Sequence, residues 1–274
     1  MASSYETAPV TFRSPPVIEV ALAVQFQPGV LDTTRILGQF WPLISGEYPR
    51  LEPQPAFPPQ TEEFGRPSPV QIEMLAGPPA SRFWFLSEAG ERLVQVQSDR
   101  VIFNWRKTDD ADQYPRYREL RPEFERHFTE LLGLLTADEQ AEVRPTWCEV
   151  TYVNHILGET DTQPPSLGEV LTVVEDPAAS ASLPELEDAQ LLQRFRLTDE
   201  AGTEPVGRLH VTAAPAVRNI DQRPLLSLSL VARLRAIEAT PEGALASLDR
   251  GRDVIVRGFR DLTMPSMHER WGIE

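Results

Sequence analysis

Six side chains of this 274-residue chain could form a site for an anionic ligand. They comprise two carboxylates on predicted strands and four basic groups of the second half: Glu19, Glu149, Arg194, Arg196, Arg208 and His210. Guanidinium groups bind a carboxylate or a phosphate through paired hydrogen bonds, so arginines and a histidine on one sheet face predict an anion site. The competing interpretation is an ordinary solvated face, on which the arginines pair with Glu and Asp across strands.

Glu19 and Glu149 occupy equivalent positions in two similar segments, residues 14–26 and 144–156. If the two carboxylates lie close together, they could share a proton, a cation or a partner arginine and act as an acid/base pair. The alternative is structural, because a repeated glutamate shortly after a proline can satisfy backbone donors at the start of a strand. The residues alone leave both roles open.

No familiar catalytic or metal-binding motif occurs in the sequence. It lacks GxxxxGK[ST], GxGxxG, GxSxG and HExxH, and its four histidines have no ligand-like spacing. Of these, His127 is expected to be structural and His268 to be solvated. The single cysteine, Cys148, excludes a thiolate zinc site within the chain and lies on the apolar parity of a predicted strand, which predicts a buried, inert thiol. We expect no metal and no cofactor, and we assign no catalytic residue.

The charge balance disfavours nucleic acid as a partner. Basic residues number 26 against 41 acidic ones, a formal charge of −15, whereas phosphate binding needs clustered Lys and Arg. Acidic residues are concentrated in residues 159–193, which hold no Lys or Arg before Arg194, so the neighbouring strands can still present a basic face. No apolar run reaches the roughly 20 residues of a membrane span, and the first residues lack signal-peptide character. With a single cysteine, these features predict a cytoplasmic protein that does not enter a membrane.

Alternating polarity and turn residues predict the elements of the first half. Residues 17–26, VIEVALAVQF, alternate as a strand with one buried face, and a helix follows over residues 32–48. The Pro-rich stretch 49–79 excludes a helix or a central strand and predicts a long surface loop, with a polyproline ligand for a partner as the alternative. Further elements are antiparallel strands at 70–75, 82–87, 93–97 and 101–107 and a helix at 117–135.

The second half repeats this order. Residues 144–156 align with 14–26, and RFRLTDEAG (194–202) aligns with RFWFLSEAG (82–90). Strands at 206–212 and 225–234 and a helix at 241–262 follow. The space after the first strand holds a weak helical stretch, SLGEVLTVV, and the acidic linker 159–193. The pattern predicts two copies of a strand–helix–antiparallel meander–helix unit, with boundaries at residues 1–140 and 141–274.

This order of elements predicts an α+β fold. Two fused copies would join into one curved antiparallel sheet, backed by helices on one face and open on the other. The apolar parity of each strand would pack under the helices, which leaves the six candidate side chains on the open face. The element order resembles the TATA-binding-protein-like and helix-grip groups of folds, a resemblance that implies a saddle-shaped sheet and no particular function.

Two short motifs resemble those of an uncharacterised, sporadically distributed bacterial family. Its P-P-[IV]-x-E-[AV] strand and its aromatic-Gly tail are matched here by Pro15, Pro16, Val17, Glu19, Val20, Trp271 and Gly272. The resemblance implies a bacterial cytoplasmic protein and marks Glu19 as a signature position. It implies no activity.

Three functions are compatible with these patterns. The first is a non-enzymatic binding or assembly protein, which presents the open sheet face and the Pro-rich loop to a protein partner or to a second copy. The second is an enzyme or sensor that binds a small anionic ligand through the six candidate residues. The third is a nucleic-acid-binding saddle, which the charge balance disfavours. A cavity of several hundred Å³ where the arginines converge would favour the small ligand, and a flat face covered by a second copy would favour assembly.

Overall fold

The chain adopts an α+β fold with one large antiparallel sheet. The computed structural model describes residues 10–27, 30–31, 35–58, 60–65, 81–136, 143–175 and 186–274. None of the described helices is both long enough and apolar enough to cross a membrane.

The first half supplies one side of the sheet and one long helix. Its elements in chain order are β1 (Val17–Phe26), η1 (Ile36–Phe40), α2 (Trp41–Ile44), β2 (Arg50–Pro55), β3 (Ser81–Leu86), β4 (Arg92–Gln97), β5 (Arg100–Arg106) and α3 (Tyr117–Thr136). The strands expected at 17–26, 82–87, 93–97 and 101–107 and the helix expected at 117–135 are confirmed to within one residue at each end. The strand expected at 70–75 lies outside the described residues.

The second half supplies the other side of the sheet and a second long helix. Its elements are β6 (Pro145–Leu157), α4 (Leu167–Val170), β7 (Leu191–Thr198), β8 (Pro205–Val217), β9 (Pro224–Arg235), α5 (Pro241–Leu262) and α6 (Pro265–Trp271). The helix expected at 241–262 is confirmed at both ends. Thr240 caps it, since its side-chain oxygen accepts a hydrogen bond from the Gly243 N–H, and Pro241 suits the first helical position.

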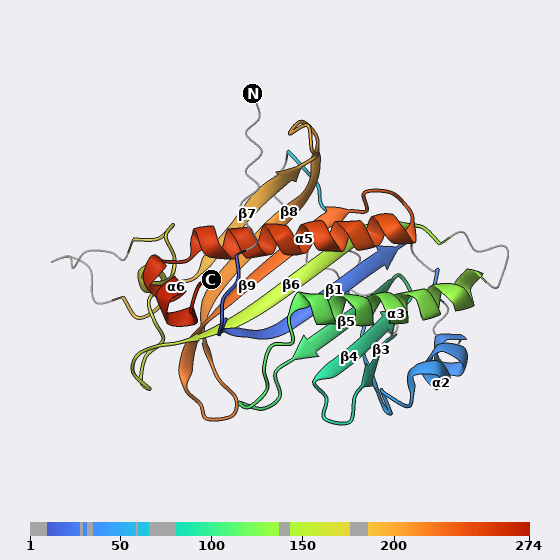
Figure 1. Cartoon of the computed structure of the whole chain (residues 1–274), viewed down its shortest axis with the longest axis horizontal. Helices are drawn as coiled ribbons and strands as arrows, with labels where there is room; N and C mark the ends of the chain where they lie inside the picture. The colour runs from blue at the N-terminus through green and yellow to red at the C-terminus, as the bar shows by residue number, and fades with distance from the viewer. Residues whose placement is uncertain are drawn as a thin grey trace.

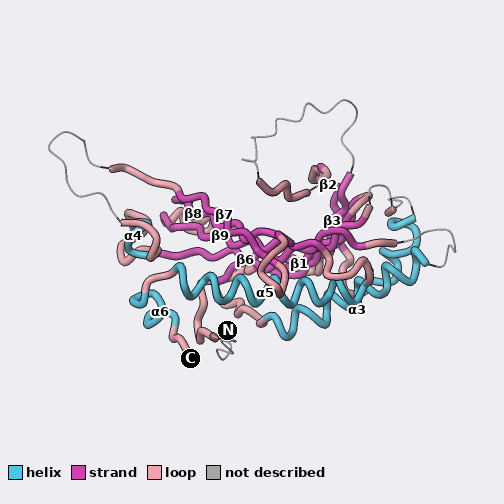
Figure 2. Tube along the Cα trace, turned by 90° about the horizontal axis from the view of Figure 1, so that it is seen from above, coloured by secondary structure: helices cyan, strands magenta, loops and turns pink. Residues whose placement is uncertain are grey.

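The two halves form one continuous sheet. The nine strands lie in the order β2-β3-β4-β5-β1-β6-β9-β8-β7, and β1 pairs with β6 at the centre (Figure 1). The long helices α3 and α5 lie side by side on one face of this sheet (Figure 2). We call the other face of the sheet the open face.

Alternation along β1 and β6 sorts their side chains between these two faces. Val20, Leu22 and Val24 of β1 and Cys148 and Val150 of β6 are at most 1% exposed and belong to the hydrophobic core under the helices. Residues of the opposite parity point to the open face, because successive side chains of a strand alternate between its two sides.

Aromatic side chains at helical spacing hold α3 against the sheet. Phe124 and Phe128 stack on each other with ring centroids 5.4 Å apart, and Phe128 stacks on Phe26 of β1 at 6.1 Å. Burial of each such side chain contributes about 1.5–3 kcal/mol. The apolar stripes of the helices therefore cover one face of the sheet and leave the polar parity of the strands facing the other way.

The helix expected over residues 32–48 is shorter than predicted. Residues 32–34 lie outside the described residues, and the helical chain ends at Ile44, whose carbonyl accepts hydrogen bonds from the N–H groups of Glu47 and Tyr48. Gly46 has low helix propensity, and the turn around it brings Tyr48, 1% exposed, into the core. Burial of this tyrosine outweighs further extension of the helix.

The C-terminal segment is folded, which corrects the expectation that His268 is solvated. Trp271 of α6 is 5% exposed and packs on Phe259 with ring centroids 5.0 Å apart. His268 is half-buried, and its Nε2 lies 2.9 Å from the hydroxyl of Thr263. The weak helical stretch of residues 166–174 is a single turn, α4, capped by Ser166.

The two halves arrange their strands alike. β3, β4 and β5 lie beside β1 in the same order in which β7, β8 and β9 lie beside β6. Gly90 and Gly202, which the sequence alignment places together, both have a left-handed φ, of 78° and 74°. These features agree with a duplicated unit. The duplication and the boundary near residue 140 stay predictions.

Gly207 of β8 lies where a side chain has no room. A Cβ at this position would collide with the backbone carbonyl of Arg233 on β9 and lie 2.9 Å from the Cα of Leu234. We predict that G207A lowers the free energy of unfolding by about 1–3 kcal/mol, as overpacking does. Urea unfolding of the full chain measures this difference.

Gly133 of α3 provides the matched control. A Cβ at Gly133 would have no neighbouring atom within 4 Å. G133A is therefore expected to raise the free energy of unfolding by about 0.5–1 kcal/mol, because alanine has the higher helix propensity. If both alanine variants shifted stability in the same direction, the close approach of β8 and β9 at Gly207 would be wrong.

Candidate functional site

The register of the sheet aligns the candidate side chains in rows across the open face. One row, from β1 to β7, holds Ala23, Glu149, Arg233, Arg208 and Arg196. The next row holds Ala21, Thr151, Val231, His210 and Arg194. Five of the six candidate residues, all except Glu19, therefore fall in two neighbouring rows.

Residues 56–65, which we call the strap, cross this face after β2. Gln97 of β4 exchanges hydrogen bonds of 3.0 Å with the backbone N–H and carbonyl of Phe57, and Gln25 of β1 accepts one of 3.2 Å from the Gln60 N–H. At the far end Arg208 of β8 donates to the carbonyl of Glu63. The strap thus spans the sheet from β4 to β8, with residue 59 outside the described residues.

The loop expected over residues 49–79 is wrong for residues 50–55, which form β2, whereas residues 56–58 and 60–65 belong to no helix or strand. The described part of the Pro-rich stretch first forms β2, which lies at the edge of the sheet, where prolines such as Pro53 and Pro55 are tolerated. The strap then lies on the sheet. The side chains of Gln97 and Gln25 accept hydrogen bonds from its backbone N–H groups, as the backbone of a neighbouring strand would do in a sheet. Residues 66–80 lie outside the described residues.

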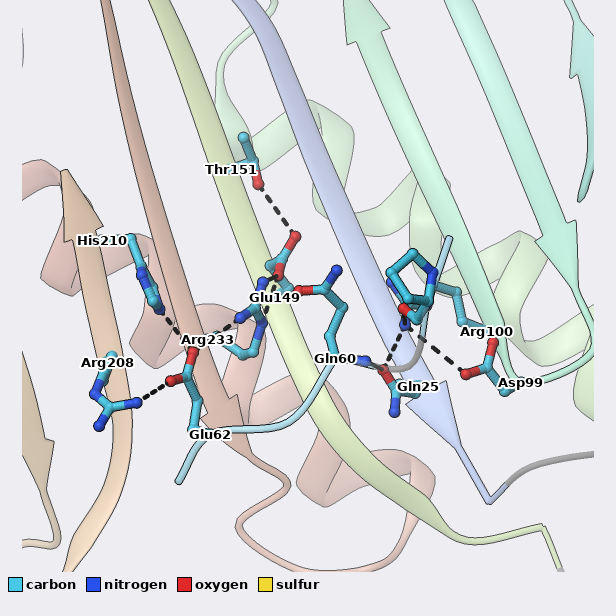
Figure 3. Close-up of polar contacts among 11 residues, drawn as sticks. Gln25, Gln60, Glu62, Asp99, Arg100, Glu149, Thr151, Arg208, His210 and Arg233 are labelled. Carbon is cyan, nitrogen blue, oxygen red and sulfur yellow. Dashed lines mark hydrogen bonds and ion pairs between the residues drawn. The ribbon is translucent and has the colours of Figure 1, made fainter. Parts of the chain in front are cut away.

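Glu62 of the strap is the centre of the site. It is 6% exposed, and its Oε1 accepts hydrogen bonds from Nη1 of Arg233 at 2.8 Å and from Nε2 of His210 at 2.6 Å (Figure 3). Its Oε2 accepts from Nη1 of Arg208. Burial raises the pKa of Glu62, but the hydrogen bonds from His210 and Arg208 and the charge of Arg233 lower it to about 2. An ionised carboxylate only accepts, so the hydrogen of His210 is on Nε2.

Glu149 is the second carboxylate of the site. Nε of Arg233 donates to Oε2 of Glu149 at 2.7 Å, so this arginine connects Glu149 to Glu62. We call the five residues Glu62, Glu149, Arg208, His210 and Arg233 the carboxylate cluster. Two guanidinium charges balance two carboxylate charges, so the cluster is neutral when His210 is neutral and carries one positive charge when His210 is protonated.

Arg194 and Arg196 lie beside the cluster without joining it. Both arginines lie on β7, the edge strand, where Arg194 pairs with His210 and Arg196 with Arg208 of β8. Both side chains are exposed. Neither side chain has a hydrogen bond or an ion pair with another described residue. These two arginines therefore present positive charge that the described chain does not neutralise.

The two glutamates of the repeated segments do not meet, which excludes the alternative in which they share a proton or a cation. Glu19 lies opposite Val153 and Glu149 opposite Ala23, four residues apart along the pairing of β1 with β6. At about 3.3 Å per residue this separates them by about 13 Å along the strands. Glu19 accepts instead a hydrogen bond of 2.6 Å from Nδ2 of Asn104. Because β1 and β6 run antiparallel, positions that are equivalent in the two repeated segments lie toward opposite ends of the paired strands.

A small pocket lies between the strap and the sheet. It has a volume of about 170 Å³ and is lined by Phe57, Gln60, Arg100, Glu149 and Arg233, among others. Arg100 is 5% exposed and donates to Oε1 of Gln25 at 2.6 Å, yet its Nε is buried with no hydrogen-bond partner in the described residues (Figure 3). Burial lowers the pKa of Arg100.

Three residues of the site were not among those predicted from the sequence: Glu62, Arg100 and Arg233. Arg233 has a signal, because it continues the polar parity of Ser227 and Ser229 along the same strand. Arg100 immediately precedes the strand predicted at 101–107 and shares the parity of Asn104 and Arg106, a signal of the same kind. Glu62 has none, because nothing in a Pro-rich stretch indicates which strand it will cross.

Neither a metal centre nor a reactive thiol emerges from the described residues. No group of three or more His, Cys, Asp and Glu side chains in them is placed to hold a metal ion. Cys148 is 1% exposed, and burial raises its pKa to about 12, which confirms the expected buried, inert thiol. His127 is likewise buried and bonded to the hydroxyl of Tyr48, as expected for a structural histidine.

Comparison with known proteins identifies no relative. No model of a known protein family matches the sequence, and a search of curated proteins found no match.

Glu62 is predicted to hold the strap on the sheet. In E62Q the carboxylate charge is lost, so the strap should open and the amides of Phe57 and Gln60 should exchange hydrogen about tenfold faster. Hydrogen exchange followed by mass spectrometry measures this. The matched control is E63Q, the same change at the exposed neighbouring residue, which should leave exchange unchanged. Equal exchange in E62Q and the wild type would contradict the role of Glu62.

The contribution of Glu62 should depend on pH with a defined sign. Its pKa falls from an ordinary value of 4.5 to about 2 in the folded chain, so the folded state favours the ionised form. The stabilisation is complete above pH 4.5 and decreases as the pH falls toward 2. The difference in unfolding free energy between wild type and E62Q should therefore narrow as the pH falls from about 5 to about 3. A difference that stays constant down to pH 3 would refute this assignment.

Proposed function

We propose that this chain is a non-enzymatic binding protein that recognises an acidic, extended segment of a protein partner on its open sheet face, beside the strap. The supporting observation is the carboxylate of Glu62, which two arginines and a histidine bind in the same way as they would bind a carboxylate from another molecule. The face therefore binds carboxylates, and the chain itself supplies two of them, Glu62 and Glu149.

The arginines of β7, which no described residue neutralises, support a binding position for the partner beside this strand. Arg194 and Arg196 continue the two rows that contain the cluster, and both are exposed. An acidic segment beside them would form ion pairs with these two arginines, which Glu62 does not contact. Electrostatic complementarity of this kind chiefly supports specificity and association rate.

The position of β7 supports an extended conformation for the partner. β7 is the last strand of the sheet, so one of its edges has no neighbouring strand among the described residues. Leu192, on the same face as the two arginines, is 63% exposed, and Phe195, on the other face, is 40% exposed. A strand added to such an edge bonds through its backbone, while its alternate side chains meet charged and apolar groups.

The size of the pocket under the strap favours a protein partner over a small ligand. Its volume of about 170 Å³ is below the several hundred Å³ typical of small-molecule sites. The basic side chains of β7 lie outside it. A small anion remains the second candidate because Arg100 lines this pocket with an unpartnered, buried Nε. In a second form of the proposed function, the protein partner is another copy of this chain, which associates through β7.

The duplicated strand–helix–meander–helix unit belongs to the proposal as well. It is supported by the matching strand orders beside β1 and β6. In the duplicated arrangement the second half carries Arg194, Arg196, Arg208 and Arg233, and the first half supplies the strap and Arg100. The resemblances to known fold groups and to an uncharacterised bacterial family, and a cytoplasmic location, stay predictions.

Binding of an acidic peptide tests the proposed function. The probe is a fluorescein-labelled peptide of alternating glutamate and leucine, with alternating glutamine and leucine as its neutral counterpart, followed by anisotropy. We expect R194Q/R196Q to weaken binding of the acidic peptide about tenfold, and added salt to weaken it in the wild type. E62Q should tighten it, because Arg208 and Arg233 then become available.

The control variant for this test is R118Q/R270Q. It removes the same charge from two exposed arginines outside the open face, on α3 and α6, and should leave the affinity unchanged. Failure of both peptides to bind, or equal binding of both, would refute the proposal. Sedimentation of the unliganded variants shows whether the partner is a second copy, in which case R194Q/R196Q is monomeric and the control is not.

A further inference from the structure

A second cavity lies on the other face of the sheet, among the helices. Its volume is about 600 Å³, within the range of ligand pockets. It is formed by the segment before β1, the start of α3, the centre of β6 and the middle of α5. The sheet separates it from the strap and the carboxylate cluster.

The walls of this cavity are mostly apolar. Phe12, Val17, Ile255 and Phe259 are each less than 9% exposed and line it. Such walls favour a ligand with a hydrocarbon or aromatic body, whose burial contributes about 25 cal/mol per Å².

Two tyrosines supply a hydrogen-bond donor in the wall of the cavity. The hydroxyl oxygens of Tyr114 and Tyr152 lie 2.8 Å apart, and both residues line the cavity. Burial raises the pKa of both tyrosines, so both hydroxyls are protonated at neutral pH. The contact between them uses one of the two hydrogens. The other has no acceptor among the described residues, so it can be donated to a ligand.

Arg252 of α5 supplies a positive charge next to this pair. It lines the cavity, and its Nε is buried without a hydrogen-bond partner in the described residues. Its Nη1 is bonded to Asp253 at 2.8 Å, an interaction that leaves the Nε side of the guanidinium for another acceptor. A buried N–H without a partner is costly, so the guanidinium of Arg252 would gain from an additional acceptor, such as an anionic oxygen bound in the cavity.

The remaining charged groups at the cavity have partners or lie in solvent. Arg116, in a left-handed conformation with φ 68°, donates to the carbonyls of Phe12 at 2.8 Å and Arg13 at 3.0 Å and so fixes the segment before β1 as one wall. Arg118 is exposed, and Glu274 lies 3.6 Å from Arg13. A non-glycine residue in this backbone region is uncommon and marks a conformation that its surroundings impose.

We propose that this cavity binds a small amphipathic carboxylic acid. Its apolar body lies against Phe12, Val17 and Phe259, and its carboxylate accepts hydrogen bonds from the tyrosine pair and from the guanidinium of Arg252. This site is independent of the proposed function, because it lies on the opposite face of the sheet.

Isothermal titration of the full chain with decanoate tests this proposal, with 1-decanol as the neutral probe. We expect decanoate to bind with a Kd of about 100 μM or tighter and decanol to bind about tenfold more weakly. R252Q should weaken decanoate binding about tenfold. The matched control is R260Q on the same helix, where Arg260 contacts Asp261 as Arg252 contacts Asp253 but does not line the cavity.

Further variants separate the cavity from the open face and from folding. Y114F/Y152F removes both hydroxyls and should weaken decanoate binding while decanol binding is retained, which also shows that the cavity is intact. R194Q/R196Q should bind decanoate as the wild type does. No decanoate binding, equal affinity for decanol, equal effects of R252Q and R260Q, or a loss in R194Q/R196Q would each overturn the inference.

Discussion

The antiparallel pairing of β1 with β6 is the constraint on which the rest of the structure depends. It joins two meanders into one sheet of nine strands and makes the alternation of side chains continuous from one edge to the other. Because the apolar parity of these strands must be buried, α3 and α5 cover the same face, and the polar parity of both halves is left on the opposite face. The site on that face follows from this division, since residues that are distant in the sequence align in rows only when the two halves share a sheet.

The strap compensates the repulsion between neighbouring arginine charges on the open face. Arg233, Arg208 and Arg196 stand in one row on three adjacent strands, where like charges repel each other. Of these three arginines, Glu149 forms a hydrogen bond with Arg233 alone, whereas Glu62 accepts hydrogen bonds from both Arg233 and Arg208. Burying charges is costly unless they are paired and hydrogen-bonded, so the strap stays on the sheet because its carboxylate completes this row. Arg196, at the edge, stays in solvent and keeps its charge available.

The two faces of the sheet offer different chemistry. The open face combines exposed arginines with an edge strand and suits a charged, extended partner, whereas the helix side encloses a mostly apolar cavity with a tyrosine pair and one arginine. Both proposed sites bind carboxylates, but one is a surface and the other is an enclosed volume. The strands carry residues of both sites, and the aliphatic core side chains Val20, Leu22 and Val150 line neither of them.

Local patterns in the sequence determined most of the elements and the faces of the strands. Alternation at 17–26 and helical spacing at 117–135 and 241–262 reflect which side chains must be buried, and burial is periodic within an element. The same alternation predicted that Arg208, His210 and Glu149 share a face. Only the tertiary structure decided which of them meet: the register of β1 with β6 separated Glu19 from Glu149, and the strap brought Glu62 to residues about 150 positions away in the chain. The physical reason is that ion pairing depends on distance in space. A Pro-rich segment without a periodic pattern carries no information about which strand it will cross.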